Sequence, residues 1–400
     1  MALVASAALC ARLAILAVLV AAGVAPISRV EFQLIAYALA VTSAVQVIVD
    51  SSTAGAFTVV NWDRYAAIGK SLWAGVFRLQ AMAAVFVCLG PMAIVGAVGH
   101  SREGLLVGGA VGAAAMAENI ARFARCRYQR SLEFRHFAAV DLTLGATRLA
   151  GAVSLIVWST GAFLLAQLLS VFVGLAWVAV SWREARRDCP LPAAGTRETL
   201  ADLWPYSAGA AVSSAYSQVP TIVVGGVGGL SAGAVYGIAT RVTQPTELLP
   251  AALASVRLPF LVGTDSARRR ALVRHQLRFA WISGVIVALA VILSAPLAAR
   301  LFDHEPSTTG VVIATLALAL PLKFTNYQLV AIAISCGQAK ARLVAAARVG
   351  VFSLVLTVPA SVVDVRLVPA VVVASEALLL LQLRKLQRRS TAFSPRVAEA

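Results

Sequence analysis

The sequence predicts an all-α, polytopic membrane protein with about 12 transmembrane helices. Of its 400 residues, 60% are hydrophobic and only 13% are charged, whereas a soluble domain is about half apolar and a quarter charged. Apolar stretches of about 20 residues recur along the whole chain, and each is long enough to cross a bilayer. The basic residues collect in short clusters between these stretches, as they do in the loops of membrane proteins.

Twelve spans follow from the apolar windows and from the polar residues that interrupt them. No basic segment precedes the first span, so we expect a retained helix; the alternative is a cleaved signal peptide that ends near "AAGVA". Proline residues interrupt the seventh, eighth and tenth spans. The predicted spans cover residues 3–25, 32–50, 74–97, 104–121, 137–158, 161–182, 204–226, 231–261, 279–296, 310–335, 341–360 and 367–384.

The distribution of arginine and lysine orients the chain. Loops on one side of the predicted membrane, together with the C-terminal tail, hold 21 of the 34 basic residues, and the opposite loops hold 4. Because basic loops stay on the cytoplasmic side, both termini are predicted to be cytoplasmic. The same distribution accounts for the net charge of +16, so we expect no nucleic-acid partner.

Enzymatic activity is not predicted. All predicted external loops are short and leave no room for an external catalytic domain, and no P-loop, HExxH or DxD pattern is present. The four histidines and five cysteines are scattered, without the spacing of a metal site or of a disulfide framework. We therefore expect no cofactor and no metal.

The chain divides near its middle at the longest polar break, with six spans before it and six after it. Such a duplication is typical of transporters built from parallel repeats, in which the substrate lies between the two lobes. We therefore predict two six-helix bundles around a central cavity. The predicted parts are an N-terminal lobe at 1–182, a cytoplasmic linker at 183–203, a C-terminal lobe at 204–388 and a cytoplasmic tail at 389–400.

Three stretches carry a family resemblance. "APISRVEFQLIAYALAVTSAVQVIVDSS" leads into the second span, "GGLSAGAVYGIATRV" leads into the eighth, and "NYQLVAIAISCGQAKARLVAAARVGV" joins the tenth to the eleventh. They are similar to the polysaccharide-exporter branch of the multidrug/oligosaccharidyl-lipid/polysaccharide (MOP) flippase superfamily, which includes O-antigen flippases. This chain departs from the family pattern at Gln33, at Ser51, and at Gln218 in the seventh span, where relatives often carry an aspartate.

The resemblance implies a substrate class and a location. It implies a monomeric protein of the bacterial cytoplasmic (inner) membrane, in contact with membrane lipid, that moves a lipid-linked anionic glycan precursor. The pyrophosphate between lipid and sugar is the negatively charged part of such a substrate. A coupling cation or proton is the further partner that the resemblance implies, although the departure at Gln218 means that the relatives' aspartate role does not carry over.

Four cations lie deep in predicted spans and are the candidate substrate-binding residues. Their depth is about 14–19 Å from a span end, near the middle of a hydrocarbon core about 30 Å thick. A charge at that depth must face protein or water, and an arginine fork can hold phosphate oxygens at two points. They are Arg12, Arg148, Arg241 and Lys323.

The competing interpretation is that these cations form internal ion pairs. Glu247 and Glu376 are the deep acids, and we assign them, with Asp50, a charge-balancing or coupling role. Because four deep cations outnumber two deep acids, the sequence predicts a positive surplus that an anion or water would compensate. Glu118 stands four residues before Arg122, a spacing that permits an ion pair along one helix.

Proline residues within the spans are candidate hinges. A proline removes a backbone donor and bends a membrane helix, which is tolerated where the helix borders protein or a watery cavity. Rocking between two access states would use such bends. The candidates are Pro220, Pro245, Pro250 and Pro321.

Together these features favour a flippase or exporter of a lipid-linked oligosaccharide or polysaccharide precursor that works by alternating access. The first alternative is a cation-coupled, multidrug-type exporter, which predicts deep acids in a largely neutral pocket. A membrane glycan polymerase or ligase and a non-transporting scaffold are the further alternatives, because a fold does not establish a function.

Overall fold

The computed structural model describes residues 27–59, 69–130, 134–188, 196–247, 249–250, 254, 266–302, 306–335 and 338–392. Within these ranges the regular structure is entirely helical. The helices are α2 (Arg29–Val59), α4 (Gly69–Gly99), α5 (Arg102–Arg130), α6 (Phe134–Val157), α7 (Thr160–Asp188), α8 (Thr196–Thr243), α10 (Ser266–Phe302), α11 (Pro306–Ala317), α12 (Leu320–Ser335), α13 (Ala339–Val363) and α14 (Val368–Ala392), with short 3₁₀ turns η2 (Gln244–Glu247) and η3 (Val365–Leu367).

The described helices match the predicted spans from the second onwards. Among the residues that the structure describes, eight helical stretches are long and apolar enough to cross a membrane, by length and composition, and a shorter apolar stretch covers Ala84–Gly99. The predicted first span, 3–25, lies outside the described residues. Helices α7 and α8 continue into the predicted linker, since α7 ends at Asp188 and α8 begins at Thr196.

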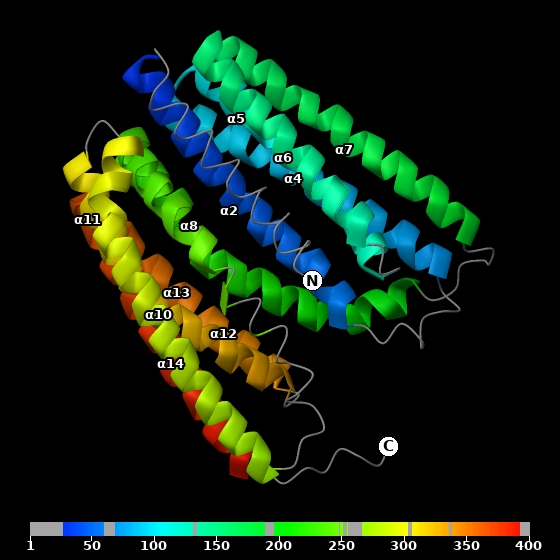
Figure 1. Ribbon diagram of the computed structural model, residues 1–400, viewed down its shortest axis with the longest axis vertical. Coiled ribbons are helices and arrows are strands. Elements are labelled where there is room, and N and C mark those ends of the chain that lie inside the picture. Colours follow the sequence, from blue (N-terminus) through cyan, green and yellow to red (C-terminus); the bar gives the residue numbers. More distant parts are fainter. Residues whose placement is uncertain are drawn as a thin grey trace.

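The helices form two groups joined by α8 (Figure 1). Helices α2 and α4 to α7 pack on one another and form the N-lobe. Helices α10 to α14 form the second group, and we refer to this group, together with α8 and η2, as the C-lobe. Helix α8 contacts α2 and α4 of the N-lobe and also α11 and α13 of the C-lobe. In Figure 1 the lobes lie close together near the upper ends of α2 and α8, and α10 and α14 diverge from α7 toward the lower end.

Helix α8 is two membrane helices joined by a tight turn. The backbone leaves helical geometry at Gly229, where φ is +84° and ψ is 176°. A residue with a side chain rarely adopts that φ, so glycine permits the reversal. The first arm of α8 therefore corresponds to the predicted seventh span and the second arm to the start of the eighth. We call the end that holds this turn the outer end, following the orientation predicted from charge.

The predicted tenth span is broken into α11 and α12. Helix α11 ends at Ala317, Leu318 and Ala319 form a turn, and α12 begins at Leu320 with Pro321 as its second residue. Proline is well tolerated there, because the first turn of a helix has no internal partner for its N–H.

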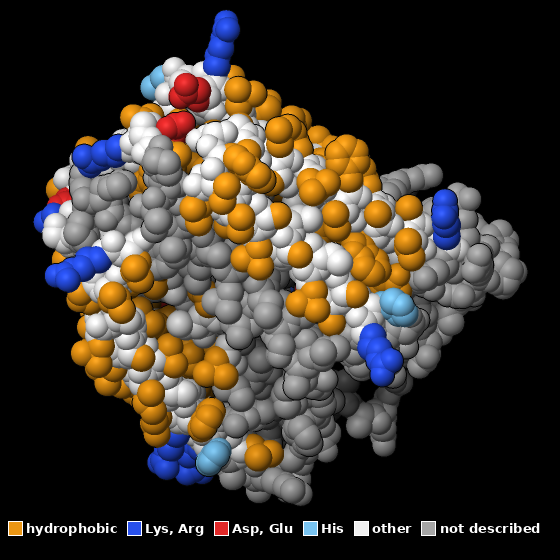
Figure 2. Space-filling model, turned by 45° about the horizontal axis from the view of Figure 1, so that its top comes forward, with side chains coloured by type: hydrophobic (Ala, Val, Ile, Leu, Met, Phe, Trp, Pro, Cys, Tyr) orange, Lys and Arg blue, Asp and Glu red, His pale blue; other side chains and the backbone are white. Residues whose placement is uncertain are grey.

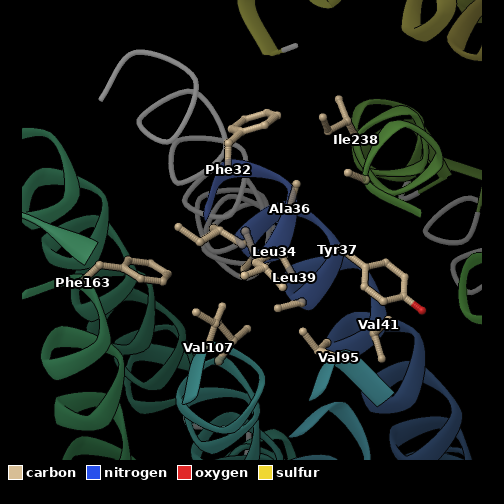
Figure 3. Close-up of a cluster of buried hydrophobic side chains, with 14 of the residues drawn as sticks. Phe32, Leu34, Ala36, Tyr37, Leu39, Val41, Val95, Val107, Phe163 and Ile238 are labelled. Carbon is tan, nitrogen blue, oxygen red and sulfur yellow. The ribbon is translucent and has the colours of Figure 1, made fainter. Parts of the chain in front are cut away.

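A core cluster joins the N-lobe to the second arm of α8. Phe32, Ile35 and Tyr37 of α2 are buried with Ala234 and Ile238 of α8, and side chains from α4 to α7 complete the cluster. Figure 3 shows Tyr37 projecting from α2 away from Phe163, on the side where the α8 segment with Ile238 lies. The C-lobe has its own core, which again includes α8 residues such as Val235 and Ala239.

The outer surface of the helices is apolar. Large hydrophobic side chains are highly exposed on several helices, among them Leu293 at 81% and Phe172 at 70%. Figure 2 shows hydrophobic side chains over a broad area, with charged ones near its margins. Because a soluble protein rarely exposes so large an apolar area, this surface fits contact with lipid. The protein is a multi-pass membrane protein.

Candidate functional site

A polar pocket lies where the second arm of α8 meets the N-lobe. It is small and has room for about one water molecule. Two of the predicted cations, Arg148 of α6 and Arg241 of α8, both line it. The other lining residues are Leu39, Thr42, Ser43, Gln46, Val111, Ala114, Ala115 and Gln167, from α2, α5 and α7.

Arg148 forms an ion pair across the N-lobe. Its Nη2 contacts Oε2 of Glu118 on α5, and the two side chains are 12% and 16% exposed. The carboxylate therefore neutralises part of the positive charge at the pocket. Glu118 lies four residues before Arg122, whose side chain is outside the described part, but the contact that the structure describes runs between helices rather than along one.

Arg241 links the two lobes. It is 6% exposed, and its Nη2 donates a hydrogen bond to the Leu39 carbonyl of α2. Its Nη1 lies 3.4 Å from Oε1 of Gln244, and the Gln244 amide lies 3.4 Å from Oε1 of Gln218. The Arg241 guanidinium is thus hydrogen-bonded to the N-lobe backbone at Leu39 and to the Gln244 side chain on the C-lobe side.

Three polar side chains of the N-lobe that line the pocket each have a buried atom without a hydrogen-bond partner in the described residues. They are Thr42 through Oγ1, Gln46 through Nε2 and Gln167 through Nε2, and each residue is 5% exposed or less. A buried polar atom without a partner is costly, so such atoms normally meet water or a ligand. All three are able to donate, as are both arginines, and the pocket therefore presents mainly donors.

Sequence reasoning missed these three residues because they are uncharged. The signal that could have found two of them, Thr42 and Gln46, is the polar run that they form with Ser43 inside an otherwise apolar span. Such residues are unusual at the middle of a membrane helix unless they face protein or water.

The second group of predicted charges forms a separate network in the C-lobe. Lys323 Nζ of α12 donates to Oε1 of Glu247 at 2.6 Å, and the Tyr327 hydroxyl donates to Oε2 at 3.4 Å. Asn326 Nδ2 donates to Oε2 of Glu376 on α14 at 2.7 Å, and the Tyr216 hydroxyl lies 3.5 Å from Oε1. Lys323 thus contacts an acid of its own lobe and does not line the pocket.

The other candidate residues fall in different places. Arg12 lies outside the described residues, as does the side chain of Asp50. Helix α8 continues through Pro220, which is buried, and Pro245 lies in the 3₁₀ turn η2 that follows α8. The carbonyl of Pro250 accepts a hydrogen bond from Nε2 of Gln328 at 3.2 Å.

The predicted surplus of deep cations is corrected among the described residues. Arg148 forms an ion pair with Glu118 and Lys323 forms one with Glu247, and two further acids, Glu376 and Asp141, are buried. The count from sequence omits Glu118, because its spacing along the chain matches it with Arg122, whereas its described partner Arg148 is 30 residues away on another helix. The pocket therefore differs from the C-lobe network in its larger number of hydrogen-bond donors rather than in its net charge.

Several solved structures that resemble this chain are those of transporters. No protein-family model and no curated protein matches the sequence. A multidrug resistance MATE family transporter of the MOP superfamily, in an inward-facing conformation, is 15% identical with a TM-score of 0.63, over 98% of this chain and 96% of that chain. The Vibrio cholerae MATE transporter VcmN, as a mutant, is 13% identical with a TM-score of 0.65, over 96% of each chain.

A third similar structure is a MOP superfamily transporter from Pyrococcus furiosus. It is 14% identical with a TM-score of 0.60, over 98% of this chain and 95% of that chain, and its binding pocket is described as having reverse polarity. These likenesses confirm the predicted fold class of an all-α polytopic membrane protein, and the similar MATE transporters have 12 helices in two bundles. They do not distinguish the O-antigen flippase branch from the multidrug branch, because at such identities only the fold is shared.

Proposed function

We propose that this protein is a transporter that moves an anionic, lipid-linked oligosaccharide or polysaccharide precursor across the cytoplasmic membrane by alternating access. The observation that carries the proposal is the pocket at the α8 junction, where Arg148 and Arg241 approach from two different lobes. A pyrophosphate presents several acceptor oxygens, and guanidinium and amide donors are the groups that bind such oxygens.

The donor set supports an anion over a cation as the bound group. Thr42, Gln46 and Gln167 each offer a buried donor atom without a partner, and these atoms share the pocket with the arginines. Ion pairing with Glu118 lowers the charge at Arg148 but does not remove its remaining N–H groups, since a guanidinium carries five.

The second candidate is a cation-coupled exporter of small molecules, and one observation favours it. The C-lobe network holds two acids, Glu247 and Glu376, around one lysine. Such an arrangement suits the exchange of a proton or cation. In a multidrug-type exporter this exchange would drive drug export, and in the leading proposal it would drive glycan movement. The multidrug transporters named above have the same fold, so the substrate class must be tested directly.

Complementation of a flippase-deficient bacterial strain tests the proposal. Arg241→Ala and Arg12→Ala are expected to abolish complementation at unaltered membrane levels. Arg278→Ala is the matched control, because Arg278 is exposed near the cytoplasmic end of α10; this variant should complement like the wild type. Unimpaired complementation by Arg241→Ala would remove the proposed substrate role of that residue.

The two candidate functions predict opposite results in a drug-export assay. The glycan flippase should not raise resistance to lipophilic cations when it is expressed in a sensitive strain. A multidrug exporter should raise resistance, and Glu247→Gln should abolish that resistance while Arg241→Ala leaves it in place. A polymerase, a ligase or a scaffold should show neither transport activity.

A further inference from the structure

The contact between α2 and α8 at the outer end is unusually tight. A methyl group at Gly225 would lie 2.0 Å from Cε2 of Tyr37, and one at Gly233 would lie 2.6 Å from Cδ2 of the same ring. The two glycines stand on opposite arms of α8, one helical turn before and after the reversal at Gly229. Together they form a socket that receives Tyr37 of the N-lobe.

This socket is held by packing and by few polar contacts. Tyr37 is fully buried, and its hydroxyl donates to the Ile222 carbonyl at 3.3 Å. Below it, a methyl group at Gly237 would lie 2.6 Å from Cβ of Ala40, so the helices remain close along this stretch. Arg241 to the Leu39 carbonyl is the next polar contact inward.

We call this close contact between α2 and α8, from Gly225 to Arg241, the outer seam. The order of its contacts along α8 places them relative to the pocket. Gly233 is four residues from Gly229 and Arg241 is twelve, which places them about 6 Å and about 18 Å from the turn at the rise of an α-helix. The Tyr37 socket therefore lies between the outer surface and the pocket. To expose the pocket outward, the protein must withdraw Tyr37 from its socket.

Arg241 belongs both to the pocket and to the close contact between α2 and α8. It lines the pocket, and it also holds the Leu39 carbonyl on the other side of the seam. An anionic oxygen is a stronger acceptor for a guanidinium than a neutral carbonyl, because both partners of the bond are then charged. An anion in the pocket therefore competes with Leu39 for the Arg241 N–H groups.

We propose that Arg241 is an anion-sensitive latch on the outer seam: an anion that binds in the pocket draws Arg241 from the Leu39 carbonyl and frees the α2–α8 contact around Tyr37 to open. This inference rests on the proposed function, since it takes the anion to be the pyrophosphate of the substrate. A ligand shifts a conformational equilibrium only through a difference in its affinity for the two states. Release of Leu39 supplies that difference.

The experiment measures binding and opening separately. Spin labels at Trp158→Cys and Val363→Cys report the outer separation of the lobes, because both positions are 74% exposed at the outer ends of the N-lobe and the C-lobe. The full chain, with its five native cysteines replaced by serine, is placed in lipid nanodiscs. Inorganic pyrophosphate is the probe, and sulfate at matched ionic strength is the control; calorimetry measures binding.

We expect pyrophosphate to raise the population with a long outer distance by at least about five-fold in the otherwise wild-type protein, a typical allosteric coupling. Arg241→Met should show the long distance without ligand and no further change with it. Arg278→Met should respond like the wild type. Binding without any change in outer distance would overturn the latch and leave the proposed function standing; absence of binding would overturn both.

A pair of glycine variants tests the socket without touching the pocket. Gly225→Ala should populate the long outer distance without ligand, because the new methyl group and the Tyr37 ring cannot share the same space. Gly226→Ala is the matched control, since a methyl group there meets nothing within 4 Å. Equal outer distances in the two variants, both eluting as folded monomers, would overturn the role of the socket.

Discussion

The ion pair between Lys323 and Glu247 offers a sharp test of what the C-lobe network does. The sequence placed Lys323 among the substrate-binding cations, whereas the structure has its Nζ 2.6 Å from Oε1 of Glu247. If Lys323 serves only to balance this acid, then removing both charges together should be tolerated far better than removing one. Lys323→Met, Glu247→Gln and the double variant form the cycle.

The burial of the pair sets the expected magnitude. Loss of one partner of a fully buried ion pair costs about 3–5 kcal/mol, because the other charge is left uncompensated. The two side chains are 17% and 18% exposed, which admits some solvation and places the expected loss at the lower end of that range. We expect about 3 kcal/mol for Lys323→Met and, because no bare charge remains, about 1 kcal/mol for the double variant.

Equilibrium unfolding in mixed micelles, followed by tryptophan fluorescence, measures these free energies. The same variants are tested for complementation. We expect the double variant to retain both folded protein and most of the activity that Lys323→Met loses through instability. Strictly additive losses of stability in the double variant would refute this reasoning. A stable double variant that transports nothing would also refute it, because the pair would then be needed for transport itself and Lys323 would again be a candidate for substrate contact.

Three further predictions follow from local geometry. Gly229→Ala should cost about 1–2 kcal/mol of stability, because φ of +84° is unfavourable for any residue with a side chain, while Gly226→Ala should cost less; thermal unfolding compares them. Hydrogen bonds from the backbone and hydroxyl of Ser28 lower the pKa of Glu31 below 4.5, so its stabilising effect is present above that pH and is lost as the pH falls below it. The difference in melting temperature between wild type and Glu31→Gln should therefore disappear in acid, and a difference that grows in acid would contradict the sign. Pro245→Ala should slow transport if the 3₁₀ turn is a hinge, and an unaltered uptake rate would count against that role.

Much of the fold could be predicted because the signals are local. A run of about 20 apolar residues specifies a membrane helix whatever its neighbours are, since the bilayer leaves the backbone no other way to satisfy its hydrogen bonds. The ends of α6 and α13 fall close to the predicted boundaries for this reason. The orientation and the boundaries of the lobes remain predictions.

The partners of the buried charges could not be predicted in the same way. Arg148 finds Glu118, 30 residues earlier, and Lys323 finds Glu247, 76 residues earlier. Depth along a helix follows from residue number, but the direction in which a side chain points depends on how the helices pack. Counting charges by depth selected Arg148 and Arg241, which line one pocket, and also Lys323, which contacts Glu247 outside that pocket. Their role in substrate binding stays a prediction.

The sequence by itself determined that this chain crosses the membrane many times and carries ionisable groups at unusual depth, because length and polarity are properties of each segment alone. Only the tertiary structure decided that Tyr37 fits between Gly225 and Gly233 and that Arg241 reaches the Leu39 carbonyl. Those contacts join residues about 200 positions apart, and their existence depends on the close approach of two helix backbones, which no single stretch of sequence encodes.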